Sequence, residues 1–103
     1  GGTQVRLVVG MIGVLTLPKD AVISSDYRLQ NDLTAVVKIE NDKYVVVDHI
    51  LDEYGIGDSL EKAQQDLLDS LVDYLMSLER REHHLADREL HKLQLLRNML
   101  TRS

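Results

Sequence analysis

The chain has 103 residues, 44% of them hydrophobic, with no cysteine and a formal net charge of -5. This length fits one small domain with a modest core, and the lack of cysteine excludes a disulfide scaffold and a zinc-thiolate site. Acidic charge and only four aromatic residues disfavour nucleic-acid binding, which needs cations and stacking platforms. No apolar run is long enough to cross a bilayer and no signal region opens the sequence, so we expect a cytoplasmic protein without a membrane association.

The first part of the chain is predicted to be rich in β-structure. Val5–Val9 and Met11–Leu17 are apolar runs with many β-branched residues, bounded by Gly10 and Pro18, and both are predicted strands. Because the second run is apolar on both faces, we expect it to be covered on both sides, in a sheet centre or at an oligomer interface. Tyr27–Leu29 is at most a short strand between turn-forming clusters.

A β-hairpin is the next predicted element. Leu33–Ile39 alternates apolar and polar side chains, with Ala35 among those on the apolar face. Asn41-Asp42 is a two-residue loop of the kind that closes a hairpin, and Tyr44–Val47 follows as the second strand. Residues 3–47 therefore form the β-rich part of the expected fold.

The stretch after this hairpin joins the sheet to a helix. Residues 48–53 form an acidic loop, and Gly55 and Gly57 predict a sharp turn, since glycine accepts backbone angles that other residues resist. Asp58, followed three residues later by Glu61, predicts a helix N-terminus with Asp58 as its cap.

Two helices are predicted after this joint. Apolar residues recur at three- and four-residue intervals and predict a long helix over residues 58–82. Asp87 can cap a second helix over residues 87–101, and the short connector favours an antiparallel helical hairpin. We expect this hairpin to assemble a homo-oligomer, a dimer or higher. The leucines of the expected oligomer interface are Leu71, Leu75, Leu78, Leu93, Leu96 and Leu100.

The joint carries a family resemblance. A hairpin, an acidic loop and the helix start Gly57-Asp58-Ser59-Leu60-Glu61-Lys62-Ala63 resemble the HicB-like antitoxin family, whose helix begins with a GxTxEEA motif. The similarity covers about residues 33–74. It implies an α+β fold, in which a small antiparallel sheet like a truncated ribonuclease H is followed by a long helix, here with a C-terminal helical hairpin in a single domain of residues 1–103.

The resemblance also implies a function. HicB-like proteins are non-enzymatic antitoxins, so we expect no catalytic residue, no metal and no cofactor, and a small basic HicA-like ribonuclease toxin as partner. Family members commonly end in a DNA-binding unit. This chain ends in a leucine-rich hairpin without a recognition helix, so DNA binding is not supported.

Charge distribution agrees with a basic partner. Ten carboxylates and two lysines lie between residues 40 and 73, and such an imbalance steers and selects a partner of opposite sign. The residues predicted to face the partner, the carboxylates by pairing with Lys or Arg and the tyrosine as an anchor, are Asp48, Asp52, Glu53, Tyr54 and Asp58.

Two other hypotheses belong to different classes. The chain is alternatively a structural scaffold that assembles through its helical hairpin without a toxin. A third hypothesis is a metal-dependent hydrolase, in which His84, Asp87 and His91 hold zinc or nickel or His49 beside Asp48 and Asp52 acts as a general base. No fourth ligand and no nucleophile is indicated for this chemistry.

Overall fold

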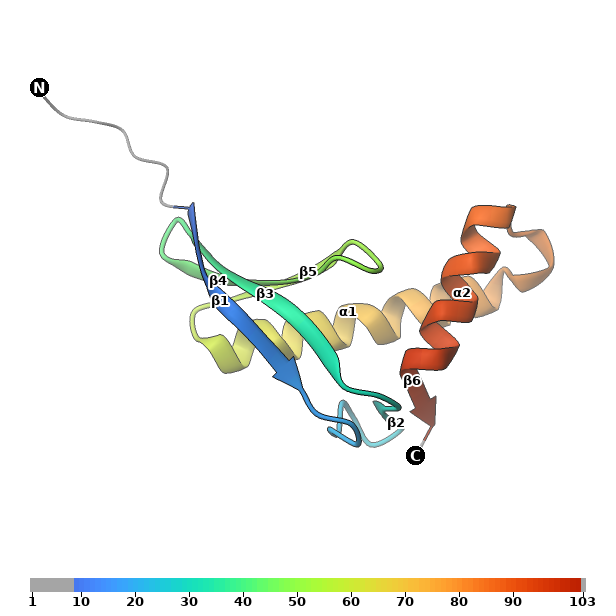
Figure 1. Cartoon of the computed structure of the whole chain (residues 1–103). Helices are drawn as coiled ribbons and strands as arrows, with labels where there is room; N and C mark the ends of the chain where they lie inside the picture. The colour runs from blue at the N-terminus through green and yellow to red at the C-terminus, as the bar shows by residue number, and fades with distance from the viewer. Residues whose placement is uncertain (1–8, 103) are drawn as a thin grey trace, which may run out of the picture.

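An α+β fold, in which an antiparallel sheet packs on a long helix, is seen in Figure 1. The structure is a computed structural model and describes residues 9–102. It confirms the expected class and the order of a sheet, a long helix and a second helix. The elements are β1 (Val9–Leu17), β2 (Tyr27–Leu29), β3 (Leu33–Glu40), β4 (Lys43–Asp48), β5 (Glu53–Gly57), α1 (Leu60–Arg80), a 3-10 turn (Glu82–His84), α2 (Asp87–Met99) and β6 (Leu100–Arg102).

Four strands form the main sheet in the order β1-β3-β4-β5, with every neighbouring pair antiparallel. The predicted hairpin is confirmed as β3 and β4. Asn41 and Asp42 have φ angles of 50° and 65°, and two positive φ angles are what a twisted two-residue hairpin turn requires. The alternation along β3 then places Leu33, Ala35 and Val37 in the core.

β1 differs from the prediction made for its apolar run. It lies at an edge of the sheet, and Val14 on it is 62% exposed. The alternative of a place in the sheet centre was wrong, because α1 packs against the β4 and β5 half of the sheet and on one face only. The other alternative, an oligomer interface, stays a prediction. β1 also continues through Gly10, with a register shift between Met11 and Gly13. Residues 5–8 of the first predicted run lie outside the described residues.

The glycine-rich stretch before the long helix is a strand and not the predicted turn. Residues Glu53–Gly57 form β5, which pairs with β4 along its whole length. The sharp turn lies earlier, where Asp52 has a φ angle of 58°. Gly55 instead permits close contact with α1, because a Cβ atom there would overlap the Ala63 carbonyl oxygen and the Leu67 amide nitrogen.

The N-cap of the long helix lies one residue later than predicted. Ser59 is the N-cap of α1, and its hydroxyl accepts a hydrogen bond from the Lys62 amide at 3.2 Å. Asp58 therefore does not cap the helix. The predicted apolar stripe is confirmed, and its buried residues are Ala63, Leu67, Leu68, Leu71, Leu75 and Leu78.

The second helix turns back over the far part of α1 (Figure 1). Ala86, and not Asp87, is its N-cap, and the Ala86 amide donates a hydrogen bond to the Glu89 carboxylate at 3.3 Å. Arg97 of α2 reaches Glu79 and Glu82 at 3.2 and 2.9 Å. Neither helix, among the described residues, has the length and apolarity that bilayer crossing demands.

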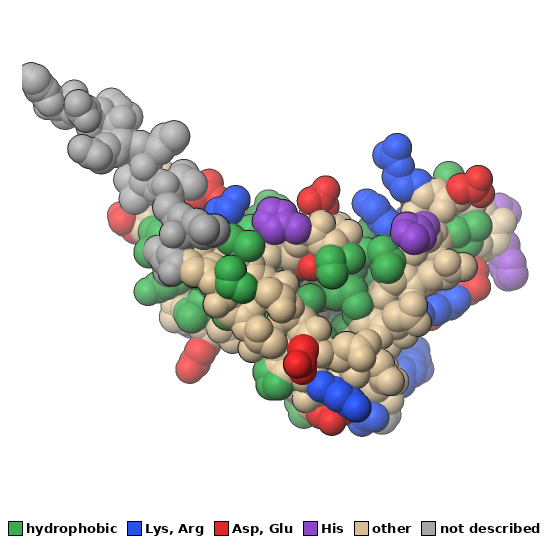
Figure 2. All heavy atoms as spheres, viewed as in Figure 1, with side chains coloured by type: hydrophobic (Ala, Val, Ile, Leu, Met, Phe, Trp, Pro, Cys, Tyr) green, Lys and Arg blue, Asp and Glu red, His purple; other side chains and the backbone are tan. Residues whose placement is uncertain are grey.

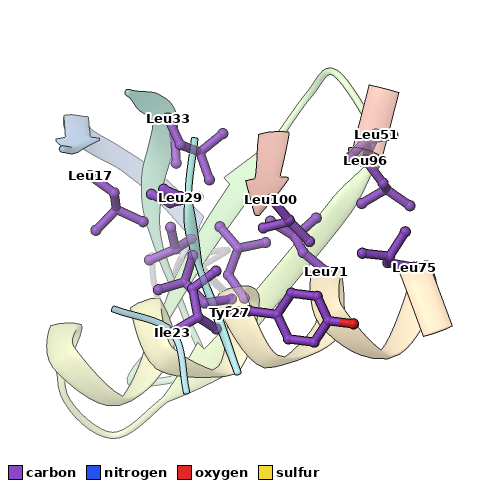
Figure 3. Packing of buried hydrophobic residues seen from close by; sticks show 14 of the residues in the cluster. Leu17, Ile23, Tyr27, Leu29, Leu33, Leu51, Leu71, Leu75, Leu96 and Leu100 are labelled. Carbon is purple, nitrogen blue, oxygen red and sulfur yellow. The ribbon is translucent and has the colours of Figure 1, made fainter. Parts of the chain in front are cut away.

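After α2, the short strand β6 pairs antiparallel with β2 and forms a second, two-stranded sheet that the sequence did not predict. Figure 3 shows side chains of β2, β6 and α1 meeting in the core, among them Tyr27, Leu100 and Leu71. The six leucines predicted for an oligomer interface are each at most 4% exposed. That prediction was wrong, because the chain itself already covers them: Leu71, Leu75, Leu78, Leu93, Leu96 and Leu100.

Candidate functional site

The sheet face opposite α1 carries exposed apolar side chains, among them Val14, Tyr54 and Ile56, and we call it the open face. The strand register places one row of side chains across all four strands on this face. This row consists of Val14, Val36, Val47 and Tyr54, and Tyr54 is 56% exposed. Figure 2 shows hydrophobic side chains on the molecular surface over the sheet, with acidic side chains beside them. Contiguous apolar surface rimmed by polar groups is typical of a protein interaction site.

A pocket of about 380 Å³ lies on the open face between β4 and β5. Val45, Val47 and Ile56 supply its apolar side chains, and Tyr54 stands beside them. Its charged side chains are all carboxylates within the described residues. The complete lining is Glu40, Val45, Val47, His49, Asp52, Glu53, Tyr54 and Ile56. The arrangement suits a ligand group that is apolar along its length and positively charged at its end.

The turn between β4 and β5 positions the acidic side of this pocket. Asp48 ends β4 with its side chain fully buried, and its two carboxylate oxygens accept hydrogen bonds from the amides of Ile50 and Leu51, each at 3.2 Å. Leu51 is 1% exposed and anchors the turn in the core, whereas Ile50 is 65% exposed. The partner-facing role expected for Asp48 is not compatible with this burial, because a partner's cation has no access to its carboxylate.

Glu53 has the most unusual electrostatic environment in the pocket. Partial burial raises the pKa of its carboxyl group above the usual value, and the nearby carboxylates of Asp48 and Asp52 raise it further, although Lys92 of α2 acts in the opposite direction. An ionised Glu53 therefore lacks full compensation within the chain. A cation from a partner would stabilise the ionised form.

Asp58 lies apart from the other predicted partner-facing residues. It follows the far end of β5, does not line the pocket, and pairs with Lys43 at the start of β4. Both side chains are exposed, and the hydrogen bond from Lys43 lowers the pKa of Asp58. Asp52, Glu53 and Tyr54 are thus brought together at one pocket, and Asp58 is not.

No pattern in the sequence indicated that Glu40, Val45, Val47 and Ile56 belong to the same site. Their common feature is the strand alternation: each points to the open face in the observed register. β4 was predicted as a strand, but β5 reads as a loop because Gly55 and Gly57 flank Ile56. Recognising β5 as a strand would have placed Tyr54 and Ile56 beside the β4 valines.

The catalytic alternatives depend on two groups of side chains, around His49 and around His84. His49 lines the pocket, but the Asp48 carboxylate expected to orient it is hydrogen-bonded to backbone amides instead. Between residues 9 and 102, no three His, Asp or Glu side chains lie close enough to share a metal ion, so His84, Asp87 and His91 do not converge.

Comparison of the chain with protein-family models, with curated proteins and with solved structures found no match. The HicB-like resemblance therefore rests on the motif residues of the sequence, and the site must be interpreted from its own chemistry.

Proposed function

We propose that the protein is a non-enzymatic, cytoplasmic binding protein that neutralises a small basic protein by covering the partner's cationic surface with its open face. An antitoxin acting on a ribonuclease toxin is the form of this function that the sequence motif favours. One observation carries the proposal: the pocket on the open face combines apolar side chains with three carboxylates, Glu40, Asp52 and Glu53, and no lysine or arginine among its described lining residues.

A lysine or arginine side chain of the partner has the chemistry to fill this pocket. Its methylene groups would lie on Val45, Val47 and Ile56, while its charged end would reach the carboxylates at the rim. Tyr54 is a suitable anchor, since tyrosine buries a large apolar ring and keeps a polar hydroxyl group. A ribonuclease must expose cations to hold phosphate, so covering those cations would inhibit it.

The acidic charge beyond the pocket supports the same kind of partner. Ten carboxylates and two lysines lie between residues 40 and 73, and one of these lysines, Lys43, is already paired with Asp58. The potential of such a surface increases the rate of encounter with a cationic protein and disfavours an anionic one.

Reversing the charge of the rim tests the proposal. The double variant D52K/E53K should fold normally and lose capture of the basic partner, because two pairing carboxylates become repelling cations at the pocket. We expect at least about a hundredfold weaker binding, measured by pull-down from native cell extract with mass spectrometry and then by calorimetry on the purified partner.

The matched control is E61K/D73K, which makes the same change in net charge at exposed positions of α1, away from the open face. It should reduce capture only through the general change in charge. Equal loss of binding in both variants would mean that net charge, and not the pocket, selects the partner. Unchanged binding by D52K/E53K would remove the pocket from the interface.

A further inference from the structure

The two edges of the main sheet differ in the hydrogen-bond partners of their outward backbone groups. At the β5 edge, the outward amide of Ile56 donates a hydrogen bond to the Asp66 carboxylate of α1 at 2.9 Å, so a charged side chain occupies this edge. At the opposite edge, no strand within residues 9–102 pairs with the outer side of β1. The β1 edge is therefore the one at which this sheet can be extended.

The regular part of this edge is short and uncharged. Gly13–Leu17 pairs in unbroken register with Leu33–Val37, downstream of the register shift at Met11. Val14 and Thr16 are exposed on the open face, and Leu15 is half-buried on the other face. Proteins usually protect an edge strand with charged side chains or proline, and this five-residue segment contains neither.

We propose that β1 pairs antiparallel with β1 of a second copy of the chain, about a two-fold axis at Leu15, so that the two four-stranded sheets become one continuous sheet. In this register Leu15 lies opposite Leu15 of the copy, and Val14 lies opposite Thr16 of the copy on the open face. Such β-branched cross-strand pairs fit a pleated surface. The proposal is independent of the function proposed for the pocket.

The charge distribution favours a second copy of the chain as the partner that pairs with the β1 edge. Residues 9–39, which contain β1, β2 and most of β3, carry three cations and three carboxylates and are neutral overall. A basic partner would find its complementary charge at the β4–β5 side of the molecule instead. Two copies of a chain with a net charge of -5 repel one another at most surfaces, and the uncharged β1 edge lets them approach with the acidic sides directed apart.

A charge-swap experiment tests the register itself. In the variant V14K/T16K, the proposed pairing sets the introduced lysines of one copy opposite those of the other, so the dissociation constant of the dimer should rise by about a hundredfold or more. The variant V14E/T16E should dissociate for the same reason. Mixing the two variants should restore a dimer, because each cross-strand pair then joins opposite charges.

Sedimentation equilibrium provides the readout, and T34K is the control. Thr34 is exposed and is the cross-strand partner of Thr16, so it lies on the same face but one strand inside the edge. The wild-type chain and T34K should both show twice the chain mass of 11.7 kDa. Circular dichroism should confirm that every variant keeps its fold, as expected for substitutions of exposed residues.

Three results would overturn the proposal: a wild-type chain that stays monomeric at about 100 μM, a V14K/T16K variant that remains a dimer, or charge-swapped variants that do not associate when mixed. The variant D52K/E53K should remain dimeric, because both changes lie at the far side of the sheet. This variant therefore distinguishes loss of dimerisation from loss of partner capture.

Discussion

The buried carboxylate of Asp48 organises the turn that carries the candidate site. By accepting hydrogen bonds from the amides of Ile50 and Leu51 it closes the link between β4 and β5, and Leu51 secures that link in the core. Asp52 and Glu53 follow directly and reach the pocket. In the sequence, Asp48 looks like one more member of an acidic surface, since nothing in the residue type separates a buried turn-forming aspartate from an exposed one.

Glu53 gives a pH-dependent prediction at the residue scale. Because its pKa is raised in the folded chain, its ionisation opposes folding, and its contribution to stability falls as pH increases from the ordinary carboxyl value of 4.5 through the raised value. E53Q should therefore increase the free energy of unfolding at pH 7 by less than about 1 kcal/mol, since the group is largely solvated.

Urea unfolding at pH 7 and below pH 4.5 measures this effect of E53Q. The increase in the free energy of unfolding should disappear at the lower pH, where the wild-type carboxyl group is protonated in both the folded and unfolded states. A gain of the same size at both values would show that side-chain packing, and not charge, is responsible.

At the scale of elements, the contact between β5 and α1 determines where the pocket lies. Gly55 and Gly57 leave no side chain between the strand and the first turns of the helix, and the backbones can approach closely. Tyr54 and Ile56, which alternate with these glycines, consequently point to the open face. The glycines thus determine how closely β5 lies on the helix. They also determine that the side chains between them in the alternation point to the open face.

Substitution of Gly55 tests this arrangement. G55A should reduce the free energy of unfolding by at least about 2 kcal/mol, because the added methyl group meets backbone atoms of Ala63 and Leu67 that cannot change rotamer. Urea denaturation measures the loss. A63G should not restore stability in the double variant, since the Ala63 atom in the way is its carbonyl oxygen. A loss below about 0.5 kcal/mol for G55A would contradict the close contact.

Local patterns predicted those elements whose side chains repeat regularly. The alternation from Leu33 to Ile39 and the Asn41-Asp42 turn were sufficient for the hairpin, and the leucine spacing was sufficient for α1. β5 and β6 were not predicted, because five and three residues carry too little periodicity and their strand character comes from distant partners. For the same reason the sequence indicated an acidic site but not the valines beneath it.

At the scale of the whole molecule, charge and apolar surface are distributed unevenly across the sheet. Residues 9–39 are neutral overall, whereas carboxylates outnumber lysines ten to two between residues 40 and 73. The open face spans both regions, from Val14 at one edge to Tyr54 at the other. The two proposed associations, with a second copy at one edge of the sheet and with a cationic protein near the other, therefore use different parts of the molecule.

Salt should separate these two associations. Raising ionic strength from about 0.05 to about 0.5 M shortens the range of electrostatic interactions severalfold, so capture of a basic partner should weaken by about tenfold or more and its association rate should fall. Dimerisation through the uncharged β1 edge should be maintained or strengthened. Calorimetry on the partner and sedimentation of the chain alone, over the same salt series, measure both. A dimer lost with rising salt would point to an ionic contact between the copies.

The pairing of β2 with β6 has a consequence for how the fold opens. Tyr27–Leu29 and Leu100–Arg102 are held together from distant parts of the chain, with Asn31 also donating to the carbonyl oxygen of Asn98, 67 residues away. Everything between them lies inside one long closed loop, and closing such a loop costs chain entropy that local contacts do not recover. These two strands should consequently be among the last to form and the first to separate. When they separate, α2 and residues 18–32 lose a common support, so hydrogen exchange should find these two distant segments opening as a single cooperative unit.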